Sequence, residues 1–218
     1  MKLWPSTTAE ARKIQIFLRK KLKILPLTIE PEYICGVDAA FVKSFAVACA
    51  SLFKFPELIS IQNSIAVAKI NFPYIPTFLS FREGRAIIKA IRGLSIKPDV
   101  ILFDGQGIAH PLSFGIASHI GVLLNTPSVG CAKSKLVGEY KEPAIKKGSY
   151  SFLFYNQKAV GVVLRTKDNV KPIFVSPGHL IDIESSIKIV LNSVTEYRIP
   201  EPLRKAHQIV KAFIKKLS

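Results

Sequence analysis

The stretch Tyr33-Ile34-Cys35-Gly36-Val37-Asp38-Ala39-Ala40-Phe41 opens a series of three strand-like runs, which continues at residues 45–53 and 60–70. Short runs of β-branched, aromatic and small apolar residues are typical of strands. Only residues 42–44 separate the first two runs, which is too short for a crossover, so the runs predict an antiparallel meander. The run at 45–53 is also far shorter than the ~20 residues that a membrane-spanning helix needs.

Downstream of the meander, helices and strands alternate. Residues 71–77 form a Pro-bounded loop, a helix is expected over 81–94, and residues 99–103 read as an apolar strand covered on both faces. A helix over 113–124 and a strand over 128–132 follow.

The two ends of the chain add helices and a hairpin. Near the N-terminus, Thr7 and Glu10 form a capping box before apolar residues at helical spacing that reach Leu25. The later elements are a hairpin of residues 149–155 and 159–165 turning at Asn156-Gln157, a strand at 173–175, and helices capped near Asp182 and near Glu201-Pro202.

The order β-β-β-α-β-α-β, followed by further strands and C-terminal helices, is that of the ribonuclease H-like fold. We therefore expect an α/β protein with a mixed central sheet flanked by helices. The chain shows no internal repeat, low-complexity tract or break in composition. We expect residues 1–218 to form one domain.

The composition favours a basic protein with a substantial core. Of the 218 residues, 49% are hydrophobic, and 31 Lys and Arg against 15 Asp and Glu give a formal net charge of +16. Such a surface favours a polyanionic partner, of which nucleic acid is the commonest, although Lys-rich surfaces also occur without one. Cys35, Cys49 and Cys131 lie in apolar surroundings with no CxxC pair, which indicates buried thiols in a reducing, cytoplasmic compartment.

Two aspartates stand out against their apolar surroundings. Asp38 is the one charged residue of residues 34–41, and desolvating a carboxylate is unfavourable unless it is paired, hydrogen-bonded or coordinated. Asp104 follows the strand at 99–103, where ligands gather in open α/β sheets, and Gly105 lets backbone approach a substrate. The alternatives are a polar face on an edge strand for Asp38 and a capped tight turn for Asp104.

A third carboxylate joins them through the expected topology. Glu83 near a helix start is ordinary dipole complementation when taken alone. In the ribonuclease H-like arrangement, however, the helix after the meander lays Glu83 across the junction of Asp38 and Asp104. Three converging carboxylates repel one another and favour a hard divalent cation, Mg²⁺ or Mn²⁺, of the kind that serves phosphoryl transfer.

Several motifs resemble the endonuclease V family, the deoxyinosine 3′ endonucleases. The resemblance spans roughly residues 8–213, nearly the whole chain. The motifs are Pro73-Tyr74-Ile75-Pro76-Thr77-Phe78-Leu79-Ser80-Phe81-Arg82-Glu83, Asp104-Gly105-Gln106-Gly107-Ile108-Ala109-His110-Pro111, Gly130-Cys131-Ala132-Lys133-Ser134, Gly178-His179 and the run from Ile199 to His207.

The resemblance implies a catalytic centre. The family's metal-binding carboxylates fall on Asp38, Glu83 and Asp104, and its fourth position, on the last helix, falls on His207. A neutral histidine there would ligate a second metal or orient water. Lys133 resembles the family's phosphate-contacting lysine. The alternative for His207 is a surface histidine.

The resemblance also implies a lesion-binding site. Pro73-Tyr74-Ile75-Pro76 is similar to the family's wedge, in which prolines stiffen the loop and an aromatic ring replaces a lost stacking partner. The extruded base would enter a pocket made largely of backbone. Besides the wedge, the resemblance assigns substrate contacts to Thr77, Leu79, Arg82, Gly105, His110 and Gly130. The alternatives are a half-buried loop aromatic for Tyr74 and a structural loop histidine for His110.

Two positions depart from the family pattern. Thr77 stands where the family usually has Gly after the wedge, which places side-chain bulk where backbone approaches the base. Leu112 stands where Arg usually follows His-Pro, so one phosphate or carboxylate contact is missing. The reaction class is unaffected, but base selectivity becomes less certain.

The resemblance implies a Mg²⁺-dependent enzyme that Mn²⁺ also supports. We expect a monomer without membrane association. The enzyme would nick DNA containing deoxyinosine at the second phosphodiester 3′ to the lesion, leaving 3′-hydroxyl and 5′-phosphate ends. One alternative keeps the fold and changes the target to inosine-containing RNA or to mismatched or branched DNA. Another is a non-catalytic nucleic-acid-binding module.

Overall fold

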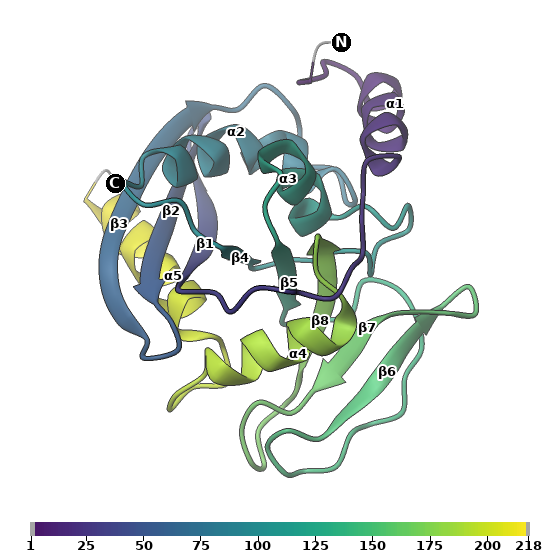
Figure 1. Ribbon diagram of the computed structural model, residues 1–218. Helices are drawn as coiled ribbons and strands as arrows, with labels where there is room; N and C mark the ends of the chain where they lie inside the picture. Colours follow the sequence, from purple (N-terminus) through teal and green to yellow (C-terminus); the bar gives the residue numbers. More distant parts are fainter. Residues whose placement is uncertain (1–2, 217–218) are drawn as a thin grey trace.

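The predicted antiparallel meander forms one half of the sheet. In the computed structural model, which describes residues 3–216, β1 (Tyr33–Val42) pairs with β2 (Phe45–Lys54), and β2 pairs with β3 (Ile59–Lys69). The turn between β1 and β2 is tight, with Val42 opposite Phe45. β3 lies at the edge of the sheet (Figure 1).

Two short parallel strands continue the sheet from β1. β4 (Val100–Phe103) pairs with β1, and β5 (Ser128–Ala132) pairs with β4. Every residue of both strands is buried, as expected for strands covered on two faces. The crossovers run through α2 (Leu79–Arg92) and α3 (Ile116–Leu124).

Three antiparallel strands complete the far edge. β8 (Ile173–His179) pairs with β5, followed by β7 (Lys158–Leu164) and β6 (Tyr150–Tyr155). The sheet order is therefore β3-β2-β1-β4-β5-β8-β7-β6, a mixed eight-stranded sheet. This is the expected ribonuclease H-like fold. In it β1, which carries Asp38, lies beside β4, which Asp104 follows.

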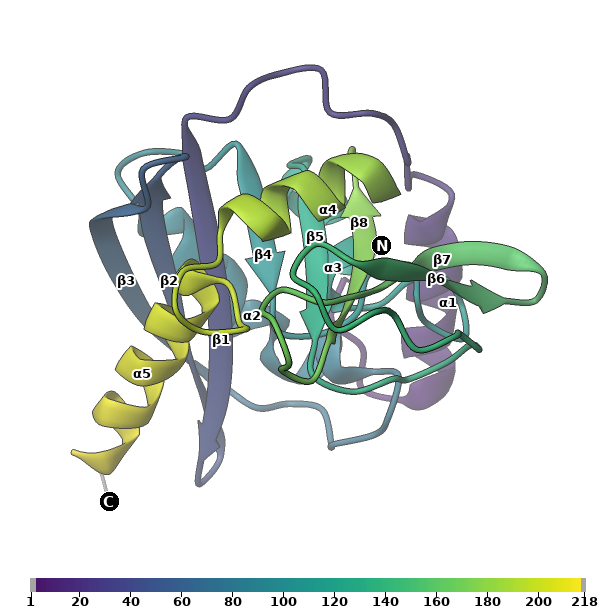
Figure 2. The same cartoon turned by 90° about the horizontal axis from the view of Figure 1, so that it is seen from below.

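Helices cover both faces of the sheet (Figure 2). α2 and α3 enclose one core with β1, β2 and β4. α4 (Ile183–Asn192) and α5 (Glu201–Lys215) cover the other face, where Ile189 and Leu203 pack against strand residues such as Val100 and Val162. α1 (Thr8–Arg19) packs outside α3.

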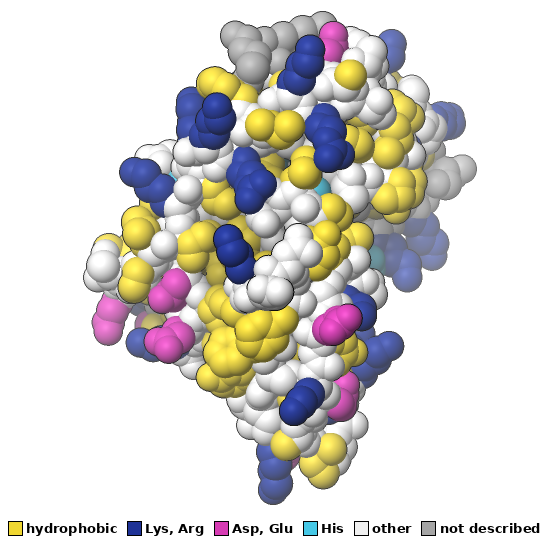
Figure 3. Space-filling model, turned by 90° about the vertical axis from the view of Figure 1, so that its right-hand side faces the viewer, with side chains coloured by type: hydrophobic (Ala, Val, Ile, Leu, Met, Phe, Trp, Pro, Cys, Tyr) yellow, Lys and Arg dark blue, Asp and Glu magenta, His cyan; other side chains and the backbone are white. Residues whose placement is uncertain are grey.

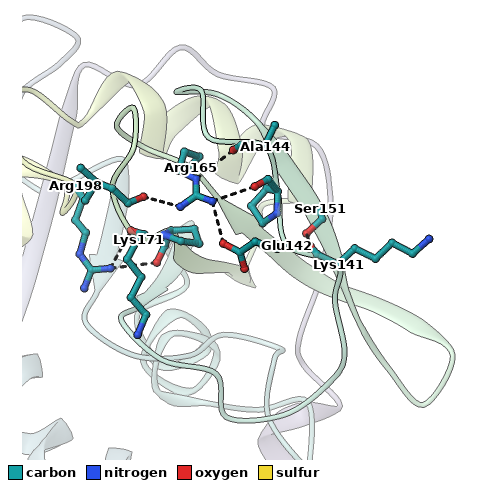
Figure 4. Close-up of polar contacts among 10 residues, drawn as sticks. Lys141, Glu142, Ala144, Ser151, Arg165, Lys171 and Arg198 are labelled. Atoms are coloured by element: carbon teal, nitrogen blue, oxygen red, sulfur yellow. Dashed lines mark hydrogen bonds and ion pairs between the residues drawn. The ribbon is translucent and has the colours of Figure 1, made fainter.

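One buried cation fastens the long connection between β5 and β6. Arg165, which follows β7, donates from its guanidinium to the carbonyls of Ala144, Pro143 and Val170 and to the Glu142 carboxylate, at 2.7–3.1 Å (Figure 4). The Ser151 hydroxyl, on β6, donates to the Lys141 carbonyl in the same connection. These contacts give an irregular segment a defined path beside β6.

Several element boundaries differ from the sequence-based predictions. α1 ends at Arg19, not near Leu25, because Pro26 disfavours helical backbone before it and Lys23 instead bonds Leu180 across the molecule. α3 begins at Ile116 because Ser113 has a positive φ of 49° and Gly115 forms the N-cap.

The last strand is longer than predicted. Helix α2 begins earlier than predicted. β8 runs to His179 instead of ending at Val175, and it accommodates Pro177 where the β5–β8 register shifts. α2 begins at Leu79, two residues before the predicted start at Phe81.

Other local predictions are confirmed. Thr7 accepts a hydrogen bond from the Glu10 amide, and Asp182 accepts one from the Ser185 amide, as N-caps do. Asn156 and Gln157 both have positive φ, the geometry that suits a two-residue hairpin turn. Cys35, Cys49 and Cys131 are free and buried.

Two general properties of the molecule are the character of its helices and the charge of its surface. None of the helices formed by residues 3–216 has both the length and the apolar character needed to cross a membrane. Figure 3, which views the side on which α1 and the β6–β7 hairpin lie, shows Lys and Arg side chains predominating over its upper part. The formal net charge is +16.

Candidate active site

The register between β1 and β4 places two carboxylates next to each other. The strands run parallel with Val37 opposite Phe103, so the following residues, Asp38 and Asp104, lie at the same level. β1 continues to Val42, whereas β4 ends at Phe103 and releases Asp104 into the next turn. The site therefore forms at the carboxyl end of the shorter parallel strand.

α2 brings the third carboxylate to the same place. Its buried face packs on β1, β2 and β3, and Glu83 lies on that face, 7% exposed. Asp38, Glu83 and Asp104 line one cavity of about 290 Å³, together with apolar residues that include Phe41 and Ile116. The structure thus brings together the three carboxylates that the sequence singled out.

Burial and mutual repulsion dominate the electrostatics of this cavity. Burial, followed by the charges of Asp38 and Asp104, raises the pKa of Glu83 to about 8. Burial also raises the pKa of Asp38, opposed by a hydrogen bond from His207. Among the described residues, no hydrogen bond reaches the Glu83 carboxylate, and the charge of Arg82 opposes the rise in its pKa without cancelling it.

Two basic side chains contact the aspartates from the other side. His207, on α5, lies with Nδ1 2.8 Å from Oδ2 of Asp38. The Lys133 ammonium, just after β5, donates to the Asp104 carboxylate. All four residues line a second hollow of about 390 Å³ beside the first. His207 is therefore part of the site and not an isolated surface histidine.

The donor set fits a hard divalent cation, although not in the present arrangement of side chains. Within residues 3–216, no three His, Cys, Asp or Glu side chains are placed to hold one ion together. The fit rests on chemistry: a buried, unpartnered Glu83 carboxylate shares a cavity with two aspartates, and all three are oxygen donors. Side-chain rotation would be required for them to converge on a single ion.

A third cavity, of about 380 Å³, lies beneath the Tyr74 loop. Tyr74 is 66% exposed, so the half-buried alternative for this ring is wrong. The lining of the cavity includes seven residues of the expected substrate site, Tyr74, Ile75, Pro76, Thr77, Leu79, Gly105 and His110, together with the catalytic candidates Asp104 and Lys133.

His110 lines the cavity and also makes structural hydrogen bonds, so its position is compatible with both of the roles considered for it. Its Nδ1 accepts from the Leu112 amide at 3.1 Å, and Nε2 lies 3.1 Å from the Thr77 carbonyl. Burial lowers the pKa of His110 to about 4, so the ring is neutral near pH 7.

Three residues expected at the substrate site, Pro73, Arg82 and Gly130, do not line this cavity. Arg82 donates to the Phe72 carbonyl at 3.2 Å and stacks over the Phe41 ring, so it supports the loop from below. Gly130 supports the turn at 105–107, because a Cβ there would lie 2.4 Å from the Gly107 nitrogen. Pro73 is exposed outside the cavity lining.

Some lining residues carried no separate signal in the sequence. Gln106, Ser134 and Lys135 line the cavity beneath Tyr74, and Gln106 bonds the Ser134 carbonyl at 3.1 Å. They adjoin Gly105 and Lys133 in the sequence, and this proximity could have predicted that they line the cavity. Leu112, where the family has Arg, packs in an apolar cluster with Phe78 and Ile75.

A ribonuclease H-like sheet with aspartates on or just after two neighbouring parallel strands, a lysine just after a third strand and a glutamate on the helix that covers them is the arrangement expected of a nuclease that hydrolyses phosphodiester bonds. Comparison with known proteins identifies the family. The Endonuclease V family model matches residues 17–208, and this chain belongs to the endonuclease V family.

Relatives match over most of their length. The endonuclease V of Dictyoglomus turgidum is 50% identical over 198 residues, covering 91% of this chain and 87% of that protein. The endonuclease V crystal structure from Streptomyces avermitilis has a TM-score of 0.94 at 36% identity, covering 98% of this chain and 96% of that one. The Ciona intestinalis endonuclease V, at 27% identity and a TM-score of 0.82, covers 96% of this chain and 98% of that one; it was solved with a 24mer DNA containing an inosine followed by a ribo-adenosine.

Proposed function

We propose that this chain is a metal-dependent DNA repair endonuclease that recognises deoxyinosine and nicks the second phosphodiester bond 3′ to it, leaving 3′-hydroxyl and 5′-phosphate ends. The observation that carries the proposal is the cavity shared by Asp38, Asp104 and the unpartnered, buried Glu83, next to the cavity beneath Tyr74. The inosine-containing DNA bound by the Ciona relative supports this choice of substrate.

Asp38, Glu83 and Asp104 would hold Mg²⁺, or Mn²⁺ in its place, with His207 beside them. When bound, the ion supplies an activated water and neutralises charge on the phosphate. The cation would also offset the repulsion of the Glu83 carboxylate by Asp38 and Asp104, which the charge of Arg82 opposes without cancelling.

The remaining polar groups act on the phosphate and the water. Lys133, 46% exposed, places its ammonium beside Asp104, where it offsets charge that develops on the scissile phosphate. His207 is held through Nδ1 by Asp38, and its side chain is 56% exposed, so Nε2 is free to orient water.

The cavity beneath Tyr74 receives the extruded base. The Tyr74 ring fills the stacking position that the base leaves, and backbone of the wedge and of Gly105 faces the base edge. Main-chain donors and acceptors distinguish hypoxanthine from adenine because position six carries oxygen in one and an amino group in the other. In this proposal the enzyme works as a monomeric, single-domain protein in the cytoplasm.

The proposal is tested by nicking assays on deoxyinosine-containing and unmodified duplexes with and without Mg²⁺. Asp104→Asn should abolish nicking but retain duplex binding in Ca²⁺. Asp99→Asn is the matched control, since Asp99 lies at the opposite end of β4 and accepts backbone hydrogen bonds from Glu32 and Tyr33. An absence of Mg²⁺-dependent nicking by the unaltered protein would refute the proposal.

Two alternatives are decided by the same assay. The ribo-adenosine after the inosine in the Ciona complex makes inosine-containing RNA the nearest competitor, so RNA and DNA versions of one strand are compared directly. For a non-catalytic binding module, neither strand would be cleaved, and Asp104→Asn would change nothing but affinity.

A further inference from the structure

The loop that carries Tyr74 is anchored at both ends. Phe72 and Phe78 are buried and pack on Phe81, with ring centroids 5.8 and 6.3 Å away. The Arg82 guanidinium donates to the Phe72 carbonyl. Tyr74, between these anchors, is 66% exposed. The ring therefore projects from a base whose position is set by packing.

Thr77 is the conformational weak point of this loop. Its φ is +74°, in the left-handed region that β-branched residues rarely adopt. A relaxed threonine at this position would turn its carbonyl away and move the preceding residues. Something outside residue 77 must therefore stabilise the observed backbone.

Two side chains bind the Thr77 carbonyl. Nε2 of Gln15 donates to it at 2.9 Å from α1, 62 residues away in the sequence. His110 donates through Nε2 at 3.1 Å, since its Nδ1 is the acceptor for the Leu112 amide. Both lone pairs of one carbonyl are thus occupied by side chains from different parts of the fold.

The hydrogen bond to Thr77 is the one polar contact found for the buried Gln15 side chain among the described residues. It is 1% exposed on the apolar face of α1, between Ala11 and Leu18. Its Oε1 atom has no hydrogen-bond partner in the described part of the chain. A buried amide that leaves its oxygen unsatisfied lowers stability compared with an apolar residue, so the amide is retained for the one bond to Thr77.

We propose that Gln15 is a positioning residue, which together with His110 holds Thr77 in the left-handed conformation and so sets the position of Tyr74 above the cavity. Its effect on nicking rests on the proposed function, whereas its effect on the loop does not. The first helix, outside the catalytic centre, thereby takes part in lesion recognition.

The test combines Gln15→Leu with Thr77→Gly. Glycine adopts positive φ without strain, so a loop with Thr77→Gly no longer needs the side-chain anchor. The control is Ile16→Ala, an exposed neighbour on α1. Loop order is measured by amide hydrogen exchange over residues 71–79, and lesion engagement by kcat and KM on a deoxyinosine duplex.

With Thr77 present, Gln15→Leu should speed exchange in this segment and lower kcat/KM about fivefold, mainly through KM, which is the typical effect of one hydrogen bond. In the Thr77→Gly background the same substitution should change kcat/KM less than about twofold. Ile16→Ala should change neither measurement.

Equal losses in both backgrounds, or unchanged exchange over residues 71–79, would overturn the proposal, because Gln15 would then act only through the packing of α1. If the unaltered protein does not nick DNA, the proposed function fails, but the exchange comparison still decides the role of Gln15. Gln15→Met replaces Gln15→Leu if the latter does not fold.

Discussion

Arg165 and Glu83 are almost equally buried, with exposed fractions of 6% and 7%, yet their surroundings are opposite. The Arg165 guanidinium donates to three carbonyls and to the Glu142 carboxylate. Glu83 receives no hydrogen bond from a described residue and faces the carboxylates of Asp38 and Asp104.

The comparison distinguishes a buried group that stabilises the fold, Arg165, from a buried group suited to bind a ligand, Glu83. Burying a charge is unfavourable unless hydrogen bonds and counter-charges replace the lost water. Arg165 has these partners within the protein, and it orders the connection between β5 and β6. Glu83 has no hydrogen bond from a described residue, and the charge of Arg82 does not cancel the effects of burial and of the two aspartates, so its pKa is raised. We infer that a cation from outside the chain stabilises its ionised form.

The largest effect expected is on the catalytic side of this comparison. Glu83→Gln keeps size and shape but removes the anionic ligand, so nicking should fall about a thousandfold or more. The free energy of unfolding should not fall, since no hydrogen bond to a described group is lost. Single-turnover nicking and urea denaturation measure the two effects. If Glu83→Gln lowered the free energy of unfolding but left nicking intact, Glu83 would be a structural residue and not a metal ligand.

Arg165→Met should show the opposite pattern. Several buried carbonyls lose a charged donor, so the free energy of unfolding should fall by about 3 kcal/mol. Nicking by the folded protein should persist, because Arg165 lies away from the cavities. Arg198→Met is the control: Arg198 bonds the Lys171 and Pro172 carbonyls at a more exposed position, and about 1 kcal/mol is expected. Equal losses would mean that burial does not matter here.

His119 is a third kind of buried polar group, kept neutral by its surroundings. It is fully buried on α3, Nδ1 lies 2.8 Å from the Ser80 hydroxyl, and burial lowers its pKa from 6.5 to about 3. Protonation therefore favours the unfolded chain. Its contribution to stability is complete above pH 6.5 and is lost progressively as the pH falls toward 3.

At pH 5 this loss should be about 2 kcal/mol, from 1.36 kcal/mol per pH unit. The free energies of unfolding of the unaltered protein and of His119→Gln are compared from pH 7.5 to 5, so that other titrating groups cancel. The difference between them should shrink with falling pH. Parallel curves would show that His119 does not control acid stability.

The smallest effect expected is at the exposed wedge. Tyr74→Ala should weaken binding to a deoxyinosine duplex about tenfold, in the range of one base–aromatic stack, with no loss of stability. Tyr74→Phe keeps the ring and should bind normally. Affinities are measured in Ca²⁺ so that the duplex stays intact. An unchanged affinity for Tyr74→Ala would remove this residue from lesion recognition.

Local patterns were sufficient for much of the fold. The meander, the apolar strands beside it, the N-caps at Thr7 and Asp182 and the Asn156-Gln157 turn depend on neighbouring residues alone. The boundaries that were wrong lie where distant contacts or special backbone override the pattern. Lys23 bonds Leu180 in place of extending α1, and Pro177 is tolerated in β8 at a register shift.

Some residues of the candidate site could be predicted from their sequence neighbours, whereas others depend on distant contacts. Asp38 and Asp104 stand out in the sequence because each is an anion within or at the end of an apolar strand. Glu83 was inconspicuous without the fold or the motif that ends in Arg82-Glu83. Arg82 and Gly130 belong to motifs but do not line the cavity beneath Tyr74; they contact the backbone of Phe72 and of Gly107, respectively.

The sequence alone determined the strand pattern, the basic surface and the set of catalytic candidates, because periodicity, charge and short motifs are properties of adjacent residues. Only the tertiary structure decided which of these groups meet. The register that sets Val37 opposite Phe103 brings Asp38 beside Asp104, and packing of α1 carries Gln15 to Thr77 across 62 residues. Such contacts depend on how separate elements pack, and no local pattern encodes that packing.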